Sequence, residues 1–214
     1  MVLDSRMLAP PEPVHAQTDA RWGSACLAYN VQIDLTPAAL EAIVRLQQNL
    51  DRELQVPLHL TPAESMHVSV YAIAPYHWES PDKEAYWRDR RTACTDALSR
   101  STATIAHACL AFTALRVLPR AVILVASDPG GQVAATRAAL RAVSAPDVPT
   151  PAYDLVHTTI ARYAADRLLA PDAVQRAEAK PIRIASEVSA MRVVRERVYP
   201  SLVLDDVARF PLRA

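Results

Sequence analysis

The sequence predicts an α+β protein that folds as one unit with two related lobes. Segments with the two-residue period of strands alternate with segments of helical period along the chain. The 214 residues suffice for one sizeable core or two small lobes, but not for several domains. The order strand, helix, strand, helix recurs in the second half with extra strands, which indicates two halves of similar build.

The composition is that of a folded protein and excludes several function classes. Apolar residues make up 51% of the chain and charged residues 21%. The 23 basic and 23 acidic residues cancel, so no overall field draws the protein to a long polyanion, and we expect no duplex DNA partner. Three glycines are too few for the spaced glycines of a dinucleotide fingerprint or a phosphate loop.

The cysteines and the ends of the apolar segments predict the compartment. Cys26, Cys94 and Cys109 are odd in number, which argues against a disulfide framework and for a reducing environment. Residues 1–24 lack the apolar run of a signal peptide, and no later segment reaches about 18 uninterrupted apolar residues. We therefore expect a cytoplasmic protein without a membrane partner. Its residues 1–24 would form a flexible or draped arm, and residues 25–214 a single two-lobed domain.

The first half is predicted to fold as strand, helix, strand, helix. Thr36 and Ser80 each precede a proline, and a hydroxyl cap followed by proline at the first helical position marks a helix start. β-branched and aromatic residues with a period of two mark the second strand, which Pro75 ends. The elements are a strand over 25–34, a helix from 37 to about 54, a strand over 66–74 and a helix from 81 to about 98.

The second half is predicted to contain strands around two helices. Residues 121–126 are apolar throughout, as in a strand that is buried on both faces. The proline-rich segment 145–151 returns the chain to a further strand. The elements are strands over 104–117 and 121–126, a helix over 132–143, a strand over 153–163, a short helix from Pro171, and strands over about 182–194 and 201–210.

Each half carries a histidine followed two residues later by a hydroxyl. In a strand, residues two apart project from one face and lie about 6–7 Å apart, so His67 shares a face with Ser69. His157 and Thr159 are paired in the same way. Apolar residues occupy the opposite face of each strand, which leaves the polar faces to line a cavity.

Two imidazole–hydroxyl pairs suit the cleavage of a phosphodiester. The reaction removes a proton from the nucleophile and delivers one to the leaving oxygen, and histidine can do either near neutral pH. The hydroxyls of Ser69 and Thr159 can donate to the phosphoryl oxygens as negative charge develops on them. This chemistry requires no metal and no cofactor.

The two motifs, His67-Val68-Ser69-Val70 and His157-Thr158-Thr159-Ile160, resemble the paired H-x-[S/T]-x motifs of the 2H phosphoesterase superfamily. The run from His157 to Arg162 is similar to the second motif of its RNA 2',3'-cyclic phosphodiesterase and 2'-5' RNA ligase-like branch. The first motif has Ser69 where threonine is commoner in that branch. The resemblance implies a bilobal fold, with two antiparallel sheets around a central groove and helices on the outside.

The resemblance also implies a function. It implies hydrolysis of a 2',3'-cyclic or 2'-5'-linked nucleotide phosphate, with His67 and His157 catalytic and with Ser69 and Thr159 binding the phosphate. In the hydrolytic direction it implies His157 as the base and His67 as the acid. The substrate would be a small nucleotide or an RNA end, and we expect the protein to act as a monomer.

Three further residues are candidates for substrate binding. Arg162 could hold a phosphate through its planar guanidinium, although strand alternation points it away from His157. Tyr71 is expected on the face of His67 and Tyr163 on the face of His157, where each could stack a base.

Other interpretations stay open at this point. The chain could be a nucleotide- or RNA-end-binding module that does not turn over its ligand. It could be a phosphoesterase for a non-nucleotide cyclic phosphate or an ADP-ribose derivative. Both histidines could also be edge-strand residues whose rings bind neighbouring carbonyls and do no chemistry.

Overall fold

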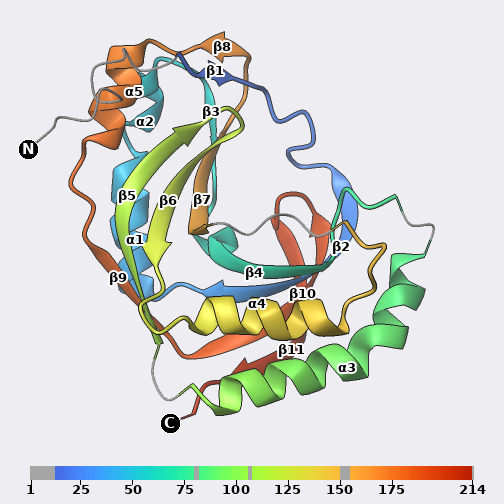
Figure 1. Cartoon of the computed structure of the whole chain (residues 1–214). Helices are drawn as coiled ribbons and strands as arrows, with labels where there is room; N and C mark the ends of the chain where they lie inside the picture. The colour runs from blue at the N-terminus through green and yellow to red at the C-terminus, as the bar shows by residue number, and fades with distance from the viewer. Residues whose placement is uncertain (1–12, 80–81, 106–107, 150–154, 214) are drawn as a thin grey trace, which may run out of the picture.

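The computed structural model describes residues 13–79, 82–105, 108–149 and 155–213 (Figure 1). Its helices are α1 (Pro37–Gln47), α2 (Leu50–Leu54), α3 (Lys83–Ala103), α4 (Gln132–Val143) and α5 (Pro171–Glu178), with a 3-10 turn over Ala63–Ser65. Its strands are β1 (His15–Ala16), β2 (Ala25–Asp34), β3 (Leu58–Leu60), β4 (His67–Ala74), β5 (Ala108–Leu118), β6 (Ala121–Ser127), β7 (Val156–Tyr163), β8 (Arg167–Leu168), β9 (Ile184–Val188), β10 (Ala190–Val198) and β11 (Val203–Pro211).

Two antiparallel sheets form the body of the molecule. One has the strand order β11-β10-β2-β4 and the other the order β3-β7-β6-β5-β9, while β1 and β8 form a separate pair. Strands from both halves of the chain build each sheet, because β10 and β11 join β2 and β4, whereas β3 joins β7. The two lobes are therefore interlocked, and the α+β architecture expected from the sequence is confirmed.

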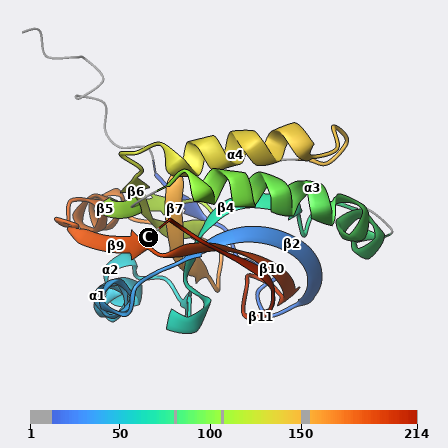
Figure 2. The same cartoon turned by 90° about the horizontal axis from the view of Figure 1, so that it is seen from below.

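The helices cover the outer faces of the two sheets. α3 and α4 lie side by side along the four-stranded sheet, where α3 contacts β2, β4, β10 and β11 (Figures 1 and 2). α1 and α5 pack on the five-stranded sheet, against β9 and β5 respectively. The motif strands β4 and β7 also contact each other, which brings the two sheets together at the motifs.

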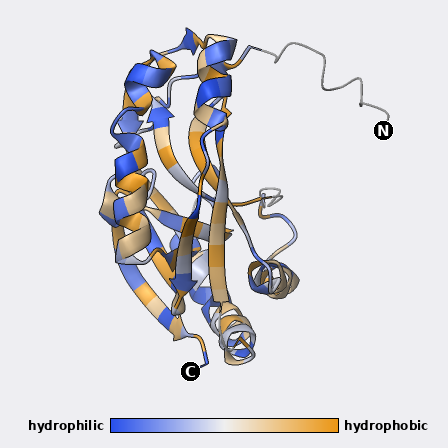
Figure 3. Cartoon of the chain, turned by 90° about the vertical axis from the view of Figure 1, so that its left-hand side faces the viewer, coloured by the Kyte–Doolittle hydropathy of each residue, from blue (hydrophilic) through white to orange (hydrophobic). Residues whose placement is uncertain are grey.

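The core lies between the sheets and their helices. Hydrophilic and hydrophobic residues alternate along both the helices and the strands (Figure 3). Val122 and Leu124 of β6 are fully buried, as the unbroken apolar run predicted. Each such side chain contributes about 1.5–3 kcal/mol of transfer free energy on burial. No helix in the described part of the chain is long and apolar enough to span a membrane.

The helix expected from 37 to about 54 is in fact two helices. Thr36 caps α1, but the helix ends at Gln47, whose buried amide donates to the carbonyls of Thr61 and Ile160 at 2.9 and 2.7 Å. The break redirects the chain so that Leu50 and Leu54 of α2 reach the core. A left-handed Gln55, with φ 53°, follows α2.

Three other boundaries differ from expectation. The strand expected over 182–194 divides at Ser189 into β9 and β10, which belong to different sheets. Thr104 caps the end of α3, so the following strand begins at Ala108 and not at Thr104. α3 begins after Asp82, whose side chain accepts from the amide of Ala85 at 2.7 Å; the expected cap at Ser80-Pro81 lies outside the described residues.

Residues 13–24 lie across both lobes. His15 and Ala16 of β1 pair with β8, and the amide of Asp19 donates to the Tyr163 carbonyl at 3.0 Å. At the other end of the segment, the amide of Gly23 donates to the Tyr199 carbonyl, beyond β10, at 2.8 Å. The segment thus connects the β7 side of the molecule to the β10 side.

Candidate active site

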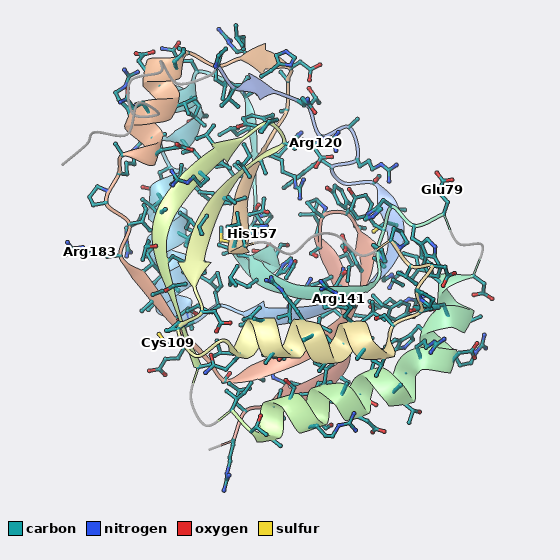
Figure 4. All side chains as sticks on the ribbon, viewed as in Figure 1. Glu79, Cys109, Arg120, Arg141, His157 and Arg183 are labelled. Atoms are coloured by element: carbon teal, nitrogen blue, oxygen red, sulfur yellow. The ribbon has the colours of Figure 1, made fainter. Side chains whose placement is uncertain are left out.

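A pocket of about 310 Å³ opens where the two sheets meet. Both imidazole–hydroxyl pairs line it: His67 and Ser69 from β4, and His157 and Thr159 from β7. Figure 4 shows His157 at the start of β7, beside the start of β4. The other lining residues are Asn30, Thr61, Ser65, Ala72, Pro75, Tyr76, His77, Arg162, Glu196, Tyr199, Pro200 and Ser201.

A β-bulge at Val70 determines which residues of β4 face the pocket. The pairing with β2 passes from Ser69 opposite Gln32 directly to Tyr71 opposite Val31, which leaves Val70 as an extra residue. The extra residue reverses the alternation, so Ala72 lines the pocket. Tyr71 is only 1% exposed and donates its hydroxyl to Ser144 Oγ at 2.9 Å. The expectation that Tyr71 shares the face of His67 is wrong for this reason.

A second bulge, at the equivalent position of the other motif, rearranges β7. The pairing with β6 passes from Thr159 to Ala161 and leaves Ile160 as the extra residue. Arg162 therefore faces the pocket, although simple alternation points it away from His157. Tyr163 is fully buried and donates its hydroxyl to the Leu118 carbonyl at 2.9 Å, so its expected place on the face of His157 is also wrong.

The ring of His67 is held in one neutral tautomer. Its Nδ1 lies 2.8 Å from the Ser65 carbonyl, and because a carbonyl only accepts, Nδ1 carries the hydrogen. Its Nε2 therefore has a lone pair, which accepts from Ser69 Oγ at 3.1 Å. Burial, with smaller contributions from the charges of Arg192 and His157, lowers the pKa of His67 to about 4 against the opposing effects of Ser65 and Asp34. The ring is therefore neutral at neutral pH.

His157 has a similar environment. Burial is the main cause that lowers its pKa, and the charges of Arg137 and Arg162 act in the same direction. Its Nδ1 is buried without a hydrogen-bond partner among the described residues. The backbone of Leu155 opposes the lowering of the pKa. Both rings line the same pocket.

Arg137 of α4 joins the two motif strands. The side chain is 8% exposed, and its Nε donates to the Val70 carbonyl at 2.9 Å. Its Nη2 donates to the carbonyls of Ser69 and Leu155 at 3.2 and 3.0 Å. Sequence reasoning missed this residue. The signal was its helical spacing from the buried Val133, which places Arg137 on the inner face of α4.

Glu196 of β10 is a second lining residue that sequence reasoning missed. Its side chain is 4% exposed, and its two carboxyl oxygens accept from Asn30 Nδ2 at 2.8 Å and from the Ser201 amide at 2.7 Å. Burial raises the pKa of Glu196, and these two donors and Arg162 oppose the rise. The signal was its alternation with the apolar Val194, which places it on an inward face.

Arg162 has fixed partners within the pocket. Its Nη1 lies 3.0 Å from Asp19 Oδ2, and its guanidinium lies over the Tyr199 ring, 5.2 Å from the centroid. Asp19 comes from the N-terminal segment, so a residue distant in sequence sets the position of the pocket arginine.

Aromatic rings border the pocket beside Arg162. The centroids of Tyr76 and Tyr199 are 4.4 Å apart, and those of Tyr76 and His77 are 5.2 Å apart. Arg21 lies over the Tyr76 ring at 5.4 Å. These rings provide the flat surfaces that the sequence assigned to Tyr71 and Tyr163. In the described part of the chain, no three His, Cys, Asp or Glu side chains are grouped to hold a metal ion.

Solved structures share this fold at low sequence identity. TT0787 of Thermus thermophilus is 17% identical with a TM-score of 0.64, over 87% of this chain and 98% of that one. E. coli LigT in a complex with 3'-AMP is 13% identical with a TM-score of 0.62, over 88% and 99%. A protein described as a phosphoesterase is 13% identical with a TM-score of 0.61, over the same shares. No protein-family model and no curated protein sequence matches the chain. The fold is that of the 2H phosphoesterases, as the motif resemblance implied.

Proposed function

We propose that the protein is a cytoplasmic, metal-independent phosphoesterase that hydrolyses a 2',3'-cyclic or 2'-5'-linked nucleotide phosphate. The observation that supports this most strongly is the convergence of His67, Ser69, His157 and Thr159 in one pocket. Two imidazoles supply both proton transfers that the reaction needs, and two hydroxyls supply donors for the phosphoryl oxygens.

The reaction follows from these groups. One neutral histidine removes a proton from water as the water oxygen attacks phosphorus. The bond from phosphorus to a ribose oxygen breaks, and the second histidine, protonated, donates its proton to that oxygen. Ser69 and Thr159 donate to the non-bridging oxygens, where charge increases in the transition state. The products are a phosphomonoester and a free ribose hydroxyl.

The pKa values bear on which histidine takes which role. The strongly lowered pKa of His67 and the lone pair on its Nε2, which accepts from Ser69 Oγ, favour the neutral form that a general base requires. This supports His67 as the base and His157 as the acid in hydrolysis, the reverse of the assignment that the family resemblance implies. The acid would gain its proton when the phosphate anion binds, because a nearby negative charge raises the pKa of an imidazole.

The pocket and its neighbours in fold support a small nucleotide or RNA end as the substrate. A space of about 310 Å³ beside aromatic rings suits a nucleotide and not a duplex. E. coli LigT has been crystallised with phosphate, with ATP and with 3'-AMP, which shows that a protein of this fold accepts such ligands.

Turnover of a panel of cyclic phosphates tests the proposal. We expect hydrolysis of nucleoside 2',3'-cyclic phosphates, followed by phosphorus NMR, which also identifies the product isomer. His67→Ala and His157→Ala should each lower the rate by about 10²–10⁴-fold in variants that circular dichroism shows to be folded. Full activity in both variants would refute the proposal.

The same panel separates the alternatives. Binding without turnover would indicate a nucleotide- or RNA-end-binding module. Turnover confined to non-nucleotide cyclic phosphates or ADP-ribose derivatives would show that the substrate is not a nucleotide phosphodiester of the proposed kind. To assign the roles, a 2'-deoxynucleoside 3'-(4-nitrophenyl phosphate) can be compared with a cyclic nucleotide. Its leaving group needs no proton, so it should restore the rate of the variant that lacks the acid. Restoration in His157→Ala alone is the outcome expected if His67 is the base.

A further inference from the structure

We propose that Glu196 makes the pocket selective for singly charged phosphodiesters over doubly charged phosphomonoesters, and so promotes release of the product. This inference rests on the proposed function, since it concerns the same pocket. It assigns to Glu196 a role in specificity and none in the proton transfers.

The hydrogen bonds of Glu196 indicate a carboxylate and not a carboxylic acid. Both oxygens act as acceptors, one from the side-chain amide of Asn30 and the other from the backbone amide of Ser201. A protonated carboxyl would need an acceptor for its hydrogen, and no hydrogen bond in the described part of the chain provides one. The side chain is buried and lines the pocket, so its charge acts on a ligand with little screening by water.

The charges of the residues that line the pocket do not favour a dianion. Among the described residues that line the pocket, Arg162 is the only lysine or arginine, and it is paired with Asp19 at 3.0 Å. Lys83 lies outside the lining, where its ammonium donates to the carbonyls of Leu27, Pro75 and Tyr76 at 3.0, 2.9 and 2.8 Å. Burial lowers the pKa of both His67 and His157, and the lining charges of Arg162 and Glu196 sum to zero. A second negative charge on the ligand would therefore be desolvated without a counterion among the described lining residues. Arg137 and Arg192, whose charges also act on the histidines, lie outside the lining: Arg137 donates to backbone carbonyls, and Arg192 is paired with Asp34 and Asp206.

Substrate and product of the proposed reaction differ in this charge. A phosphodiester carries one negative charge, whereas a phosphomonoester carries nearly two above its second pKa of about 6. Hydrolysis converts the phosphodiester into a phosphomonoester. Once this product has lost its second proton, its two negative charges no longer match the charge of the pocket. Glu196 thereby limits product inhibition.

Two stable ligands of similar shape test the proposal without turnover. At about pH 8, 2'-deoxyadenosine 3'-phosphate is a dianion, and 2'-deoxyadenosine 3'-methylphosphonate is a monoanion. Neither has a 2'-hydroxyl, so neither cyclises. We expect calorimetry to show the wild-type protein binding the methylphosphonate at least about tenfold more tightly than the phosphate, and Glu196→Gln losing this preference.

The matched control is Glu187→Gln, which removes the same charge from an exposed position on β9 and should keep the wild-type preference. Gln at 196 retains an oxygen for the Ser201 amide, and the Asn30 amide can rotate to accept from the new NH₂ group, so the fold should persist. If Glu196→Gln nevertheless unfolds, the preference of the wild-type protein for the methylphosphonate over the phosphate decides whether the proposal holds.

Equal affinity of the wild-type protein for both ligands would overturn the proposal, and so would an unchanged ratio in a folded Glu196→Gln. If neither ligand binds, the inference is also wrong. Hydrolysis is measured separately. Preference for the monoanion without any turnover would refute the proposed function alone, and turnover without the preference would refute only the role of Glu196.

Discussion

His67 couples the proposed chemistry to the stability of the protein. Its pKa falls from the ordinary 6.5 to about 4 on folding, mainly through burial. Between these values the unfolded ring binds a proton and the folded ring does not, so the free energy of unfolding decreases as the pH falls from 6.5 towards 4. Above 6.5 both states are neutral and this dependence ends.

His67→Gln should flatten that part of the pH profile. We expect urea unfolding between pH 6.5 and 4 to lose on the order of 2 kcal/mol less in the variant than in the wild-type protein. His77→Gln removes an exposed histidine and serves as the control, with a profile like that of the wild type. An equally steep profile in His67→Gln would show that His67 is not the buried neutral group described above.

Arg137 does not line the pocket, but its loss should disturb the positions of both motif strands. Arg137→Met would leave the carbonyls of Val70, Ser69 and Leu155 without their guanidinium donor. We expect a loss of about 2–4 kcal/mol in the free energy of unfolding by urea titration, together with a lower kcat. Arg141→Met, one turn further along α4 at an exposed position (Figure 4), should change stability by less than about 0.5 kcal/mol. Similar losses in the two variants would argue against the bridging role.

The limits of prediction at the residue scale have one physical cause. A two-residue period was enough to place His67 with Ser69 and His157 with Thr159, because each pair precedes its bulge. Beyond the bulges the same rule placed Tyr71, Tyr163 and Arg162 on the wrong faces. Val70 and Ile160 are ordinary strand residues in size and polarity. Only the pairing with the neighbouring strand determines that each is an extra residue.

Among the elements, the N-terminal segment 13–24 has the clearest link to the site, through Asp19 and Arg162. Asp19→Asn should release the guanidinium from its ion pair at 3.0 Å. An arginine freed from its carboxylate attracts a phosphate more strongly but holds it less well in position. We therefore expect kcat to fall severalfold while KM stays the same or decreases.

Steady-state kinetics with a cyclic nucleotide tests this expectation. The control is Asp166→Asn, which weakens another contact of the segment, the bond from the Thr18 amide to Asp166 Oδ1 at 2.6 Å, without touching Arg162. If both variants lose kcat equally, the segment acts by general stabilisation and not through Arg162.

Elements with a local signal were predicted well, and those set by long-range contacts were not. The spans of β2 and α4 match their predictions, since the periodicity of apolar residues is a local signal. The break between α1 and α2 depends on Gln47 reaching the carbonyls of Thr61 and Ile160. The division at Ser189 arises because the residues before it pair in the five-stranded sheet and those after it pair in the four-stranded sheet. Neither cause is visible in a local window of sequence.

At the scale of the whole molecule, the two sheets are built by exchange of strands between the halves of the chain. Because β10 and β11 complete the sheet of β2 and β4, the pocket receives Glu196 and Tyr199 from the end of the chain and the motifs from its middle. The equivalent bulges in β4 and β7 give the two motifs the same local geometry. The residue that follows each bulge into the pocket is Ala72 in one lobe and Arg162 in the other, so the site is symmetric in its histidines and asymmetric in its charge.

The overall charge of the molecule predicts how activity depends on salt concentration. With 23 basic and 23 acidic residues the molecule carries no net charge, and the lining charges of the pocket cancel as well. Salt between about 20 and 200 mM shortens the Debye length from about 20 to 7 Å, but it has little long-range attraction to screen. We expect kcat/KM for a cyclic nucleotide to change by less than about threefold over this range. Glu196→Gln, which makes the summed charge of the lining positive, should show the steeper decline with salt. A steep decline in the wild-type protein would instead reveal an attractive field around the pocket, and the account of its charge given above would then be wrong.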